Sequence, residues 1–241
     1  MIDWHNHILP GVDDGSRDLA ESIEMIKMQM AQAVTTVIAT PHFYANDETV
    51  EAFLERRNAA FGELKLKLPE NAPEILLGAE VKYYQGISRM ENLKALRIQN
   101  SKLLLLEMPM TVWTEYMVRE LIELAGKSSF QIVLAHVERY LKQQKASTWD
   151  RIYESGILTQ VSASFFSGLF SKRKAISLLR EGKINFIGSD CHNTTSRPPA
   201  LRSAFDMIQK KLGNTYIDQM HEFGLTVLTN KQPILYGKEE L

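Results

Sequence analysis

Short apolar runs alternate along this chain with longer segments in which apolar residues recur every three or four positions. The short runs have the length of strands, and they are continuous rather than alternating, which is typical of parallel strands covered on both faces. They are Met1–His5, Thr36–Thr40, Ile75–Glu80, Lys102–Glu107, Gln131–His136, Leu158–Ser162 and Ile184–Asp190. This pattern predicts an α/β fold with a parallel sheet.

Helical periodicity fills the segments between these runs. Leu19, Ile23, Ile26 and Met30 form one apolar stripe. The same spacing predicts helices over Thr49–Leu68, Thr114–Ser128, Lys142–Glu154, Lys172–Glu181 and Pro199–Leu212. Gly156 and Gly182 fall where the C-caps of two of these helices are expected.

Seven strand–helix units in series, with no linker between them, favour a single domain over residues 1–241. The simplest arrangement is a closed or nearly closed barrel, and a doubly wound open sheet is the alternative. Lys82–Asn100 is longer than a usual connection, so we expect an insertion over one end. After Tyr216 we expect a short helix and then a brief strand near Thr226–Leu228.

Composition and charge exclude several classes of protein. The 241 residues include 28 basic and 29 acidic side chains, a net charge of -1, which does not indicate binding to nucleic acid or to an anionic membrane. No apolar run approaches the ~18 residues of a membrane span, and the sequence starts without a signal-peptide pattern. The one cysteine, Cys191, fits a reducing cytoplasm, which is the predicted location.

The histidines gather at one kind of position. Five of the six, at or just after the C-terminal end of a predicted strand, are His5, His7, His42, His136 and His192. Glu80, Glu107 and Asp190 each close a strand in the same way, whereas His221 lies elsewhere and is expected to be a surface or packing residue. Because strand ends meet at one rim of a barrel, and because burying so many ionisable groups is costly, we predict a site for several metal ions.

The first strand runs into His5-x-His7 and then into a glycine-rich turn. Residues i and i+2 of a strand face the same side, so both imidazoles can aim at one point. Imidazole together with carboxylate suits a divalent metal. In the turn, either Asp13 or Asp14 could be a ligand while the other caps the next helix, and Asp3 is a candidate for orienting an imidazole.

Cys191 and Arg197 have the Cys-x5-Arg spacing of thiol-based tyrosine phosphatases. In those enzymes a glycine-containing loop wraps the phosphate, whereas the five intervening residues here contain no glycine. The adjacent carboxylate of Asp190 disfavours a thiolate. On a strand that continues through Asp190 and His192, the thiol would point away from the pocket. We therefore do not expect a thiol mechanism.

Motifs in order along nearly the whole chain resemble the PHP (polymerase and histidinol phosphatase) superfamily. They are Asp3-x-His5-x-His7-Ile8-Leu9-Pro10-Gly11-x-Asp13-Asp14-Gly15, Ala39-Thr40-Pro41-His42, Gly78-x-Glu80, Glu107-Met108-Pro109, His136-x-Glu138-Arg139-Tyr140 and Gly188-Ser189-Asp190-x-His192-Asn193. The opening through Gly15 and the pair Glu138-Arg139 look like the bacterial tyrosine-protein phosphatases of capsule and exopolysaccharide operons. The resemblance implies a distorted, TIM-like (βα)7 barrel.

The resemblance also implies a ligand set and two arginines. The ligands would be His5, His7, Asp14, His42, Glu80, Glu107, His136, Asp190 and His192. They would hold two or three divalent ions, usually manganese in this family, with iron, zinc or magnesium as alternatives. Arg139 matches the family arginine that binds phosphate, and Arg197 is the candidate for a second. Val137 stands where the family commonly has proline, a change that removes no chemical group.

The implied activity is hydrolysis of phosphotyrosine in a protein. The implied partner is the tyrosine-rich tail of a membrane-associated kinase that controls capsule or exopolysaccharide synthesis, with no nucleic acid and no insertion into the membrane. Two alternatives remain: a PHP phosphatase acting on a small phosphomonoester such as histidinol phosphate, and a non-catalytic phosphotyrosine-binding module. Aromatic residues after the strand ends either wall a slot for the tyrosine ring or pack onto the rim; these are Phe43, Tyr44, Phe165, Phe166 and Phe170.

Overall fold

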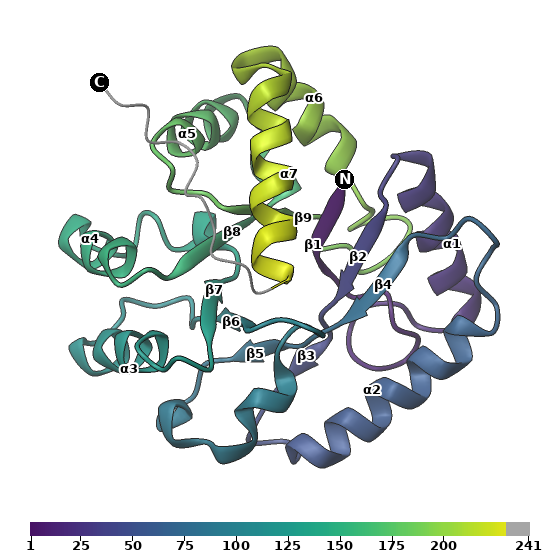
Figure 1. The fold of residues 1–241 in the computed structure, drawn as a ribbon, viewed down its shortest axis with the longest axis horizontal. Helices are drawn as coiled ribbons and strands as arrows, with labels where there is room; N and C mark the ends of the chain where they lie inside the picture. The colour runs from purple at the N-terminus through teal and green to yellow at the C-terminus, as the bar shows by residue number, and fades with distance from the viewer. Residues whose placement is uncertain (230–241) are drawn as a thin grey trace.

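The fold was analysed in a computed structural model, which describes residues 1–229. Its strands all pair in parallel and form a sheet that curls on itself (Figure 1). The strands are β1 (Ile2–Asn6), β2 (Thr36–Ala39), β3 (His42–Phe43), β4 (Glu74–Leu77), β5 (Glu80–Lys82), β6 (Leu103–Glu107), β7 (Gln131–Leu134), β8 (Leu158–Ser162) and β9 (Phe186–Gly188). Each of the seven predicted runs contains a strand; β4 and β5 divide the run Ile75–Glu80 in two, and β3 is a further short strand just beyond the run Thr36–Thr40.

The sheet has two parts, and the chain crosses from one to the other between β2 and β3 and again between β4 and β5. One part has the order β1-β2-β4 and the other β3-β5-β6-β7-β8-β9. The ring closes between the first and last strands, since the Asp190 amide donates to the His5 carbonyl (2.9 Å) and the His7 amide donates to the Cys191 carbonyl (3.0 Å). The predicted barrel is therefore confirmed, in a distorted form, and the doubly wound open sheet is wrong.

Helices cover the outside of this barrel (Figure 1). They are α1 (Leu19–Ala31), α2 (Val50–Lys65), α3 (Glu115–Ala125), α4 (Ala146–Glu154), α5 (Leu169–Arg180), α6 (Leu201–Leu212) and α7 (Asn214–Leu228). The side chains of Asp18, Thr49 and Thr114 accept hydrogen bonds from the first turns of α1, α2 and α3. Gly156 and Gly182 follow α4 and α5 with positive φ, as predicted for residues that end helices.

The third crossover differs from the prediction of a uniform series of strand–helix units. Instead of an α-helix it contains two short 3₁₀ helices, Ile87–Arg89 and Glu91–Leu96. They pack against α3 and α2 in the outer ring, so this segment is not an insertion over one end. The carboxylate of Glu120 on α3 holds the first of them by accepting hydrogen bonds from the amides of Gly86 (2.9 Å) and Ser88 (3.5 Å).

The last helix closes the N-terminal end of the barrel. α7 crosses in front of the strands in Figure 1, and its Phe223, Val227 and Leu228 join Trp4 and Phe186 in one buried cluster. The brief strand predicted near Thr226–Leu228 is wrong, because these residues complete α7. With this end covered by apolar packing, the C-terminal rim is left for polar side chains.

No helix among residues 1–229 is long and apolar enough to cross a membrane.

Two helical glycines should respond to alanine in opposite directions. In Gly224→Ala of α7, the added Cβ would lie 2.7 Å from the Trp4 ring, so overpacking of about 1–3 kcal/mol should lower the melting temperature. In Gly62→Ala of α2, no atom lies within 4 Å of the new Cβ, so the variant should gain about 0.5–1 kcal/mol. Thermal unfolding followed by circular dichroism measures both, and equal shifts would refute the close α7–β1 contact.

Candidate active site

Glu80 stands at the centre of the C-terminal rim, where β5 begins, and its side chain is completely buried. Its Oε2 atom lies 3.1 Å from His5 Nε2 and 3.0 Å from His42 Nδ1. Its Oε1 atom lies 3.0 Å from His136 Nε2. One carboxylate is therefore surrounded by imidazoles that come from three other strands or strand ends, as expected for a converging barrel.

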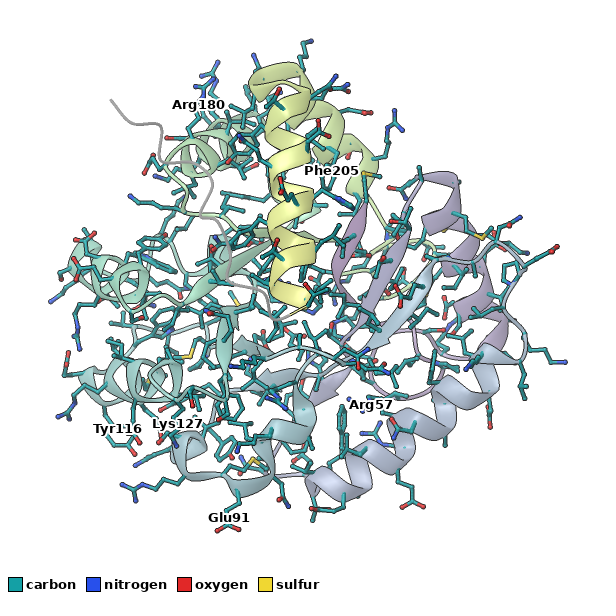
Figure 2. All side chains as sticks on the ribbon, in the orientation of Figure 1. Arg57, Glu91, Tyr116, Lys127, Arg180 and Phe205 are labelled. Carbon is teal, nitrogen blue, oxygen red and sulfur yellow. The ribbon has the colours of Figure 1, made fainter. Side chains whose placement is uncertain are left out.

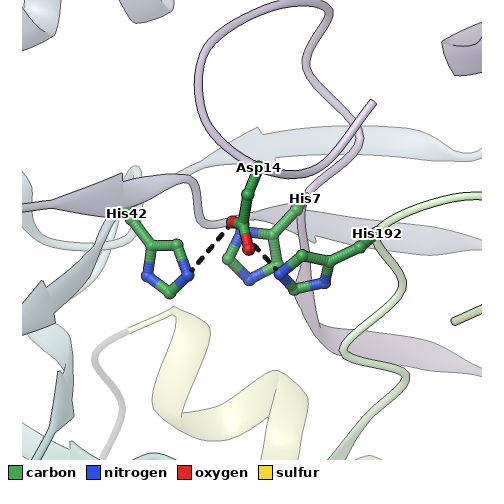
Figure 3. A group of neighbouring side chains, drawn as sticks. All are labelled: His7, Asp14, His42 and His192. Atoms are coloured by element: carbon green, nitrogen blue, oxygen red, sulfur yellow. Dashed lines mark ion pairs between the residues drawn. The ribbon is translucent and has the colours of Figure 1, made fainter. Parts of the chain in front are cut away.

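A second group lies at the more open side of the rim (Figure 3). Asp14 Oδ1 is 3.4 Å from His42 Nε2 and 3.5 Å from His192 Nε2. The His7 ring lies against the His192 ring, with centroids 3.8 Å apart. Because the Asp14 side chain is 66% exposed while those of His7 and His192 are buried, this group faces solvent through Asp14.

Both predicted arginines meet at Asp190. The Nη2 atoms of Arg139 and Arg197 donate to Asp190 Oδ2 at 2.8 Å and 2.7 Å. Burial alone would raise the pKa of Asp190, but the cationic neighbours, His136 and His5 foremost, hold it well below its usual value. Both guanidinium groups remain partly exposed, at 30% and 40% of the side chain, so they border the open face of the site.

Glu107 completes the set from β6. Its carboxylate accepts a hydrogen bond from Lys82 Nζ at 2.8 Å and lies 3.6 Å from Arg139. The structure thus brings all nine predicted ligands and both arginines to one rim, whereas His221 lies exposed on α7. The sequence assigned no role to Lys82. The contact of Lys82 with Glu107 places this residue at the same rim.

The geometry of these residues fits metal ions. Donor atoms within 4.8 Å of one another form four overlapping groups: His7, Asp14, His42 and His192; His5, His136 and Asp190; His5, His7 and Glu80; and His42, Glu80 and Glu107. Asp190 Oδ1 and His192 Nε2 are buried without a hydrogen-bond partner among the described residues, and His42 Nδ1, although 3.0 Å from Glu80 Oε2, is not aligned for a hydrogen bond with it. Buried lone pairs without donors are costly, and a shared cation satisfies them.

Two ligand positions depend on unusual backbone conformations. His136 and Asp190 have φ of +52° and +54°, a region that costs a non-glycine residue about 1–2 kcal/mol. After His136, a 3₁₀ turn buries Val137 and carries Arg139 back to the rim. After Asp190, the Asn193 side chain accepts hydrogen bonds from the following amides, including that of Arg197 (3.1 Å), and so fixes the loop of the second arginine.

Asp13 has a role that the sequence did not reveal. Its Oδ2 atom lies 2.6 Å from His7 Nδ1 and accepts the His42 amide at 2.9 Å, so it orients one ligand and anchors the strand of another. Burial would lower the pKa of His7, but Asp13 and Glu80 outweigh it and raise the pKa to about 10. The expectation that Asp13 or Asp14 caps the next helix is wrong, because Asp18 is the cap of α1.

Asp3 does not orient an imidazole, contrary to the expectation. It is completely buried and accepts hydrogen bonds from the amide (2.7 Å) and hydroxyl (2.6 Å) of Ser189, and from the Gln29 side chain (2.6 Å). Its contact with His5 is to the main-chain amide, at 3.3 Å. Asp3 therefore ties β1 to the end of β9 and to α1, beneath the ligands.

Only part of the predicted aromatic wall exists. Phe43 and Phe166 are buried in the core, so they do not line a slot. Phe170 is 79% exposed at the start of α5. Tyr44 does border the site: its ring centroid lies 5.4 Å from that of His42, and it lines a hollow of about 440 Å³ that also includes Asp14.

Cys191 is completely buried, and its Sγ faces the Asn193 carbonyl at 3.6 Å. Burial and the nearby carboxylates of Asp3 and Asp190 raise the pKa of its thiol above the ordinary range. A buried, protonated thiol is a poor nucleophile, in agreement with the sequence-based expectation.

A distorted parallel barrel with imidazoles and carboxylates at its C-terminal rim gives this chain a PHP-like fold, which it shares with histidinol phosphate phosphatase. The model of one family, described as capsular polysaccharide synthesis, CpsB/CapC, matches residues 1–226. The chain belongs to this family, which confirms the resemblance seen in its motifs.

Known relatives agree with this assignment. Tyrosine-protein phosphatase YwqE of Bacillus subtilis and the putative tyrosine-protein phosphatase CapC of Staphylococcus aureus are each 30% identical, over 96% of this chain and 92% of the relative. A solved chain from a study of YwqE and Streptococcus pneumoniae CpsB, described as metal-dependent tyrosine phosphatases, superposes with a TM-score of 0.84 at 25% identity, covering 100% of this chain and 99% of that one. Histidinol phosphate phosphatase of Lactococcus lactis shares the fold, with a TM-score of 0.51 at 12% identity, covering 88% of this chain and 92% of that one.

Removing the carboxylate of Asp13 should weaken metal binding. In Asp13→Ala, His7 loses the partner that fixes its ring, and losses of this kind usually cost about 10–100-fold in metal affinity. Titration calorimetry with Mn²⁺ measures the change. Asp47→Ala is the matched control, because Asp47 lines the same hollow without a side-chain contact to a candidate ligand. Equal affinities in both variants would contradict the orienting role.

Proposed function

We propose that this chain is a metal-dependent tyrosine-protein phosphatase. The observation that carries the proposal is the pairing of a buried multi-ligand cluster around Glu80 with two arginines that face its open side. Membership of the CpsB/CapC family supports the substrate class, because its named relatives are tyrosine-protein phosphatases.

The nine rim residues would be the ligands of two or three divalent ions, and manganese is our proposed metal. Four of these residues, His5, His7, His42 and Glu80, each belong to two of the four donor groups, so they would hold metal at the middle of the site. Ions of this kind polarise phosphoryl oxygens and make water available as a nucleophile near neutral pH. The choice of manganese rests on the family resemblance. That the site binds a divalent metal at all is supported by the imidazole and carboxylate groups of this chain.

Arg139 and Arg197 would bind the phosphoryl oxygens. A guanidinium offers a planar fork of donors that matches phosphate geometry, and its charge balances the charge that develops on the equatorial oxygens. Both groups now donate to Asp190, so a phosphate dianion would compete for the same donors. Their partial exposure leaves them able to turn toward a substrate at the rim.

The leaving group of the proposed substrate needs little help from a general acid, whose identity the proposal leaves open. Tyrosine has a pKa of about 10, so its oxygen departs with less proton donation than an alkyl alcohol requires. Tyr44 lines the hollow beside Asp14, where it would contact the substrate ring. Asp14, which lines this hollow, is 66% exposed, so the hollow reaches solvent, which suits a side chain presented by a protein.

The proposed partner is the tyrosine-rich tail of a membrane-associated kinase, and the proposed location is the cytoplasm. The capsule-synthesis description of the family supports the pathway. The single cysteine, buried and unpaired, is compatible with a reducing compartment.

The proposal predicts metal-dependent release of phosphate from a phosphotyrosine peptide. Release should be fast with Mn²⁺, fall to background with EDTA, and exceed release from histidinol phosphate under the same conditions. Colorimetric phosphate assays on both substrates, run side by side, measure this.

If histidinol phosphate is hydrolysed faster, the proposed metal site stands but the proposed substrate is wrong. Binding of a phosphotyrosine peptide without release of phosphate, in protein shown to contain metal, would favour a binding module instead.

Two single variants separate metal chemistry from thiol chemistry. Arg139→Ala should lower kcat/KM about 100–1,000-fold, the usual loss for a donor to transition-state charge. Cys191→Ser should keep most of the activity, because its thiol is buried and away from the rim. Steady-state kinetics with p-nitrophenyl phosphate measure both. A folded, metal-loaded Cys191→Ser protein with no activity would refute the metal mechanism.

A further inference from the structure

A basic groove of about 600 Å³ runs between α5 and α6. On α5 its wall follows a single helical stripe, at spacings of three and four residues, from Leu169 to Arg180. On α6 it is formed by Met207, Lys210 and Lys211. Arg180, which Figure 2 labels, donates to the Lys211 carbonyl (3.5 Å), so the two helices are in contact at the far end of the groove.

The groove concentrates positive charge that no carboxylate balances. Its five cations are Lys172, Arg173, Arg180, Lys210 and Lys211. None of them forms an ion pair within residues 1–229, and no acidic residue lines the groove. The nearby acids Glu181 and Asp206 already pair with Lys183 and Arg202, each at 2.8 Å. In a chain of net charge -1, this is a local segregation of charge that attracts an anionic partner.

Apolar side chains lie between these cations. Ile176 is buried at the floor of the groove, and Met207 lies partly exposed across from it. At the first turn of α5, Leu169 and Phe170 are 58% and 79% exposed, which is unusual for side chains of this size. The surface therefore combines an apolar strip with cationic walls, which suits a polypeptide carrying both apolar and anionic groups.

The first helix of the groove follows the strand that ends at the candidate active site. β8 ends at Ser162, whose hydroxyl lies 3.0 Å from His136 Nδ1, and α5 starts seven residues later after a 3₁₀ turn. From that rim, the 12 residues of α5 extend about 18 Å along the side of the barrel. An extended peptide of about six residues covers the same length.

We propose that this groove binds an anionic stretch of the substrate polypeptide, beside the phosphotyrosine that enters the metal site. The inference rests on the proposed phosphatase function and adds a determinant of substrate choice. The anionic groups would be glutamates or aspartates, which carry a single negative charge, or further phosphotyrosines, each of which contributes about −1.5 to −2 charges. A peptide fits better than a lipid surface, because the cations line a concave groove rather than a protruding face.

The test compares substrates that differ only in their flank. One synthetic peptide carries a single phosphotyrosine followed by five glutamates, and its partner carries five glutamines. The groove variant is Lys172→Gln, Arg173→Gln, Lys210→Gln and Lys211→Gln. The control variant removes the same number of exposed cations elsewhere, with Lys65→Gln, Lys67→Gln, Lys94→Gln and Lys102→Gln. All proteins are used with manganese, and p-nitrophenyl phosphate is the substrate without a flank.

The groove variant should raise KM for the glutamate peptide about tenfold, as expected for lost electrostatic steering. Its kcat, its turnover of p-nitrophenyl phosphate and its KM for the glutamine peptide should stay unchanged. Added salt should raise KM for the glutamate peptide in the wild type and in the control variant, and much less in the groove variant.

An unchanged KM for the glutamate peptide, or an equal rise in the control variant, would overturn the inference. Binding of the wild type to phosphatidylglycerol vesicles that is lost in the groove variant, with peptide kinetics unaltered, would assign the groove to membrane lipid and also overturn it. Failure of the phosphatase proposal itself would look different, since the wild type would then not turn over p-nitrophenyl phosphate at all.

Discussion

Glu80 carries a carboxylate that is withdrawn completely from water at the centre of the barrel rim, with imidazoles from β1, β3 and the end of β7 around it. Burial would raise its pKa, but the histidines, His5 and His136 foremost, hold the pKa well below its usual value. A charge in this position is tolerated only with cations around it. The rim therefore favours bound cations. Metal binding should accordingly stabilise the folded structure, and folding should create the metal site.

The frame that holds Glu80 lies outside the rim. Arg57, buried on α2, donates to the Gly78 carbonyl (2.8 Å) at the bend between β4 and β5, two residues before Glu80. Asp3 locks β1 to Ser189 and so fixes the spacing between His5 and Asp190. The carboxylate of Asp3 and the guanidinium of Arg57 are thus engaged in hydrogen bonds below the rim, and they support the site without belonging to the candidate ligands.

The sequence predicted the strands and the placement of the histidines well, because both depend on local pattern and on the rule that strand ends converge. It failed where tertiary packing decides. The apolar run Thr226–Leu228 reads as a strand, yet it completes α7 because Trp4 and Phe186 offer a surface for its helical face. Asp13 and Asp14 are adjacent residues of the same type, so the sequence does not distinguish their roles. Only the fold of the turn places Asp13 against His7 and leaves Asp14 exposed. Aspartate and histidine adopt positive φ more often than most residues, but residue type does not tell that His136 and Asp190, among all the aspartates and histidines of the chain, will do so.

Closure of the barrel joins β1 to the segment after β9, and this has a consequence for biosynthesis. His5 and His7 emerge from the ribosome early, whereas Asp190 and His192, which face them, are made more than 180 residues later. Pairing so distant in sequence makes folding slow, since the loop between the partners must be ordered first. Asp13 and Glu80 become available to the early histidines soon after them, but Asp190 follows only near the end of synthesis. A nascent chain that stops before β9 would lack the ligands Asp190 and His192. The complete metal site can therefore form only after the barrel has been completed.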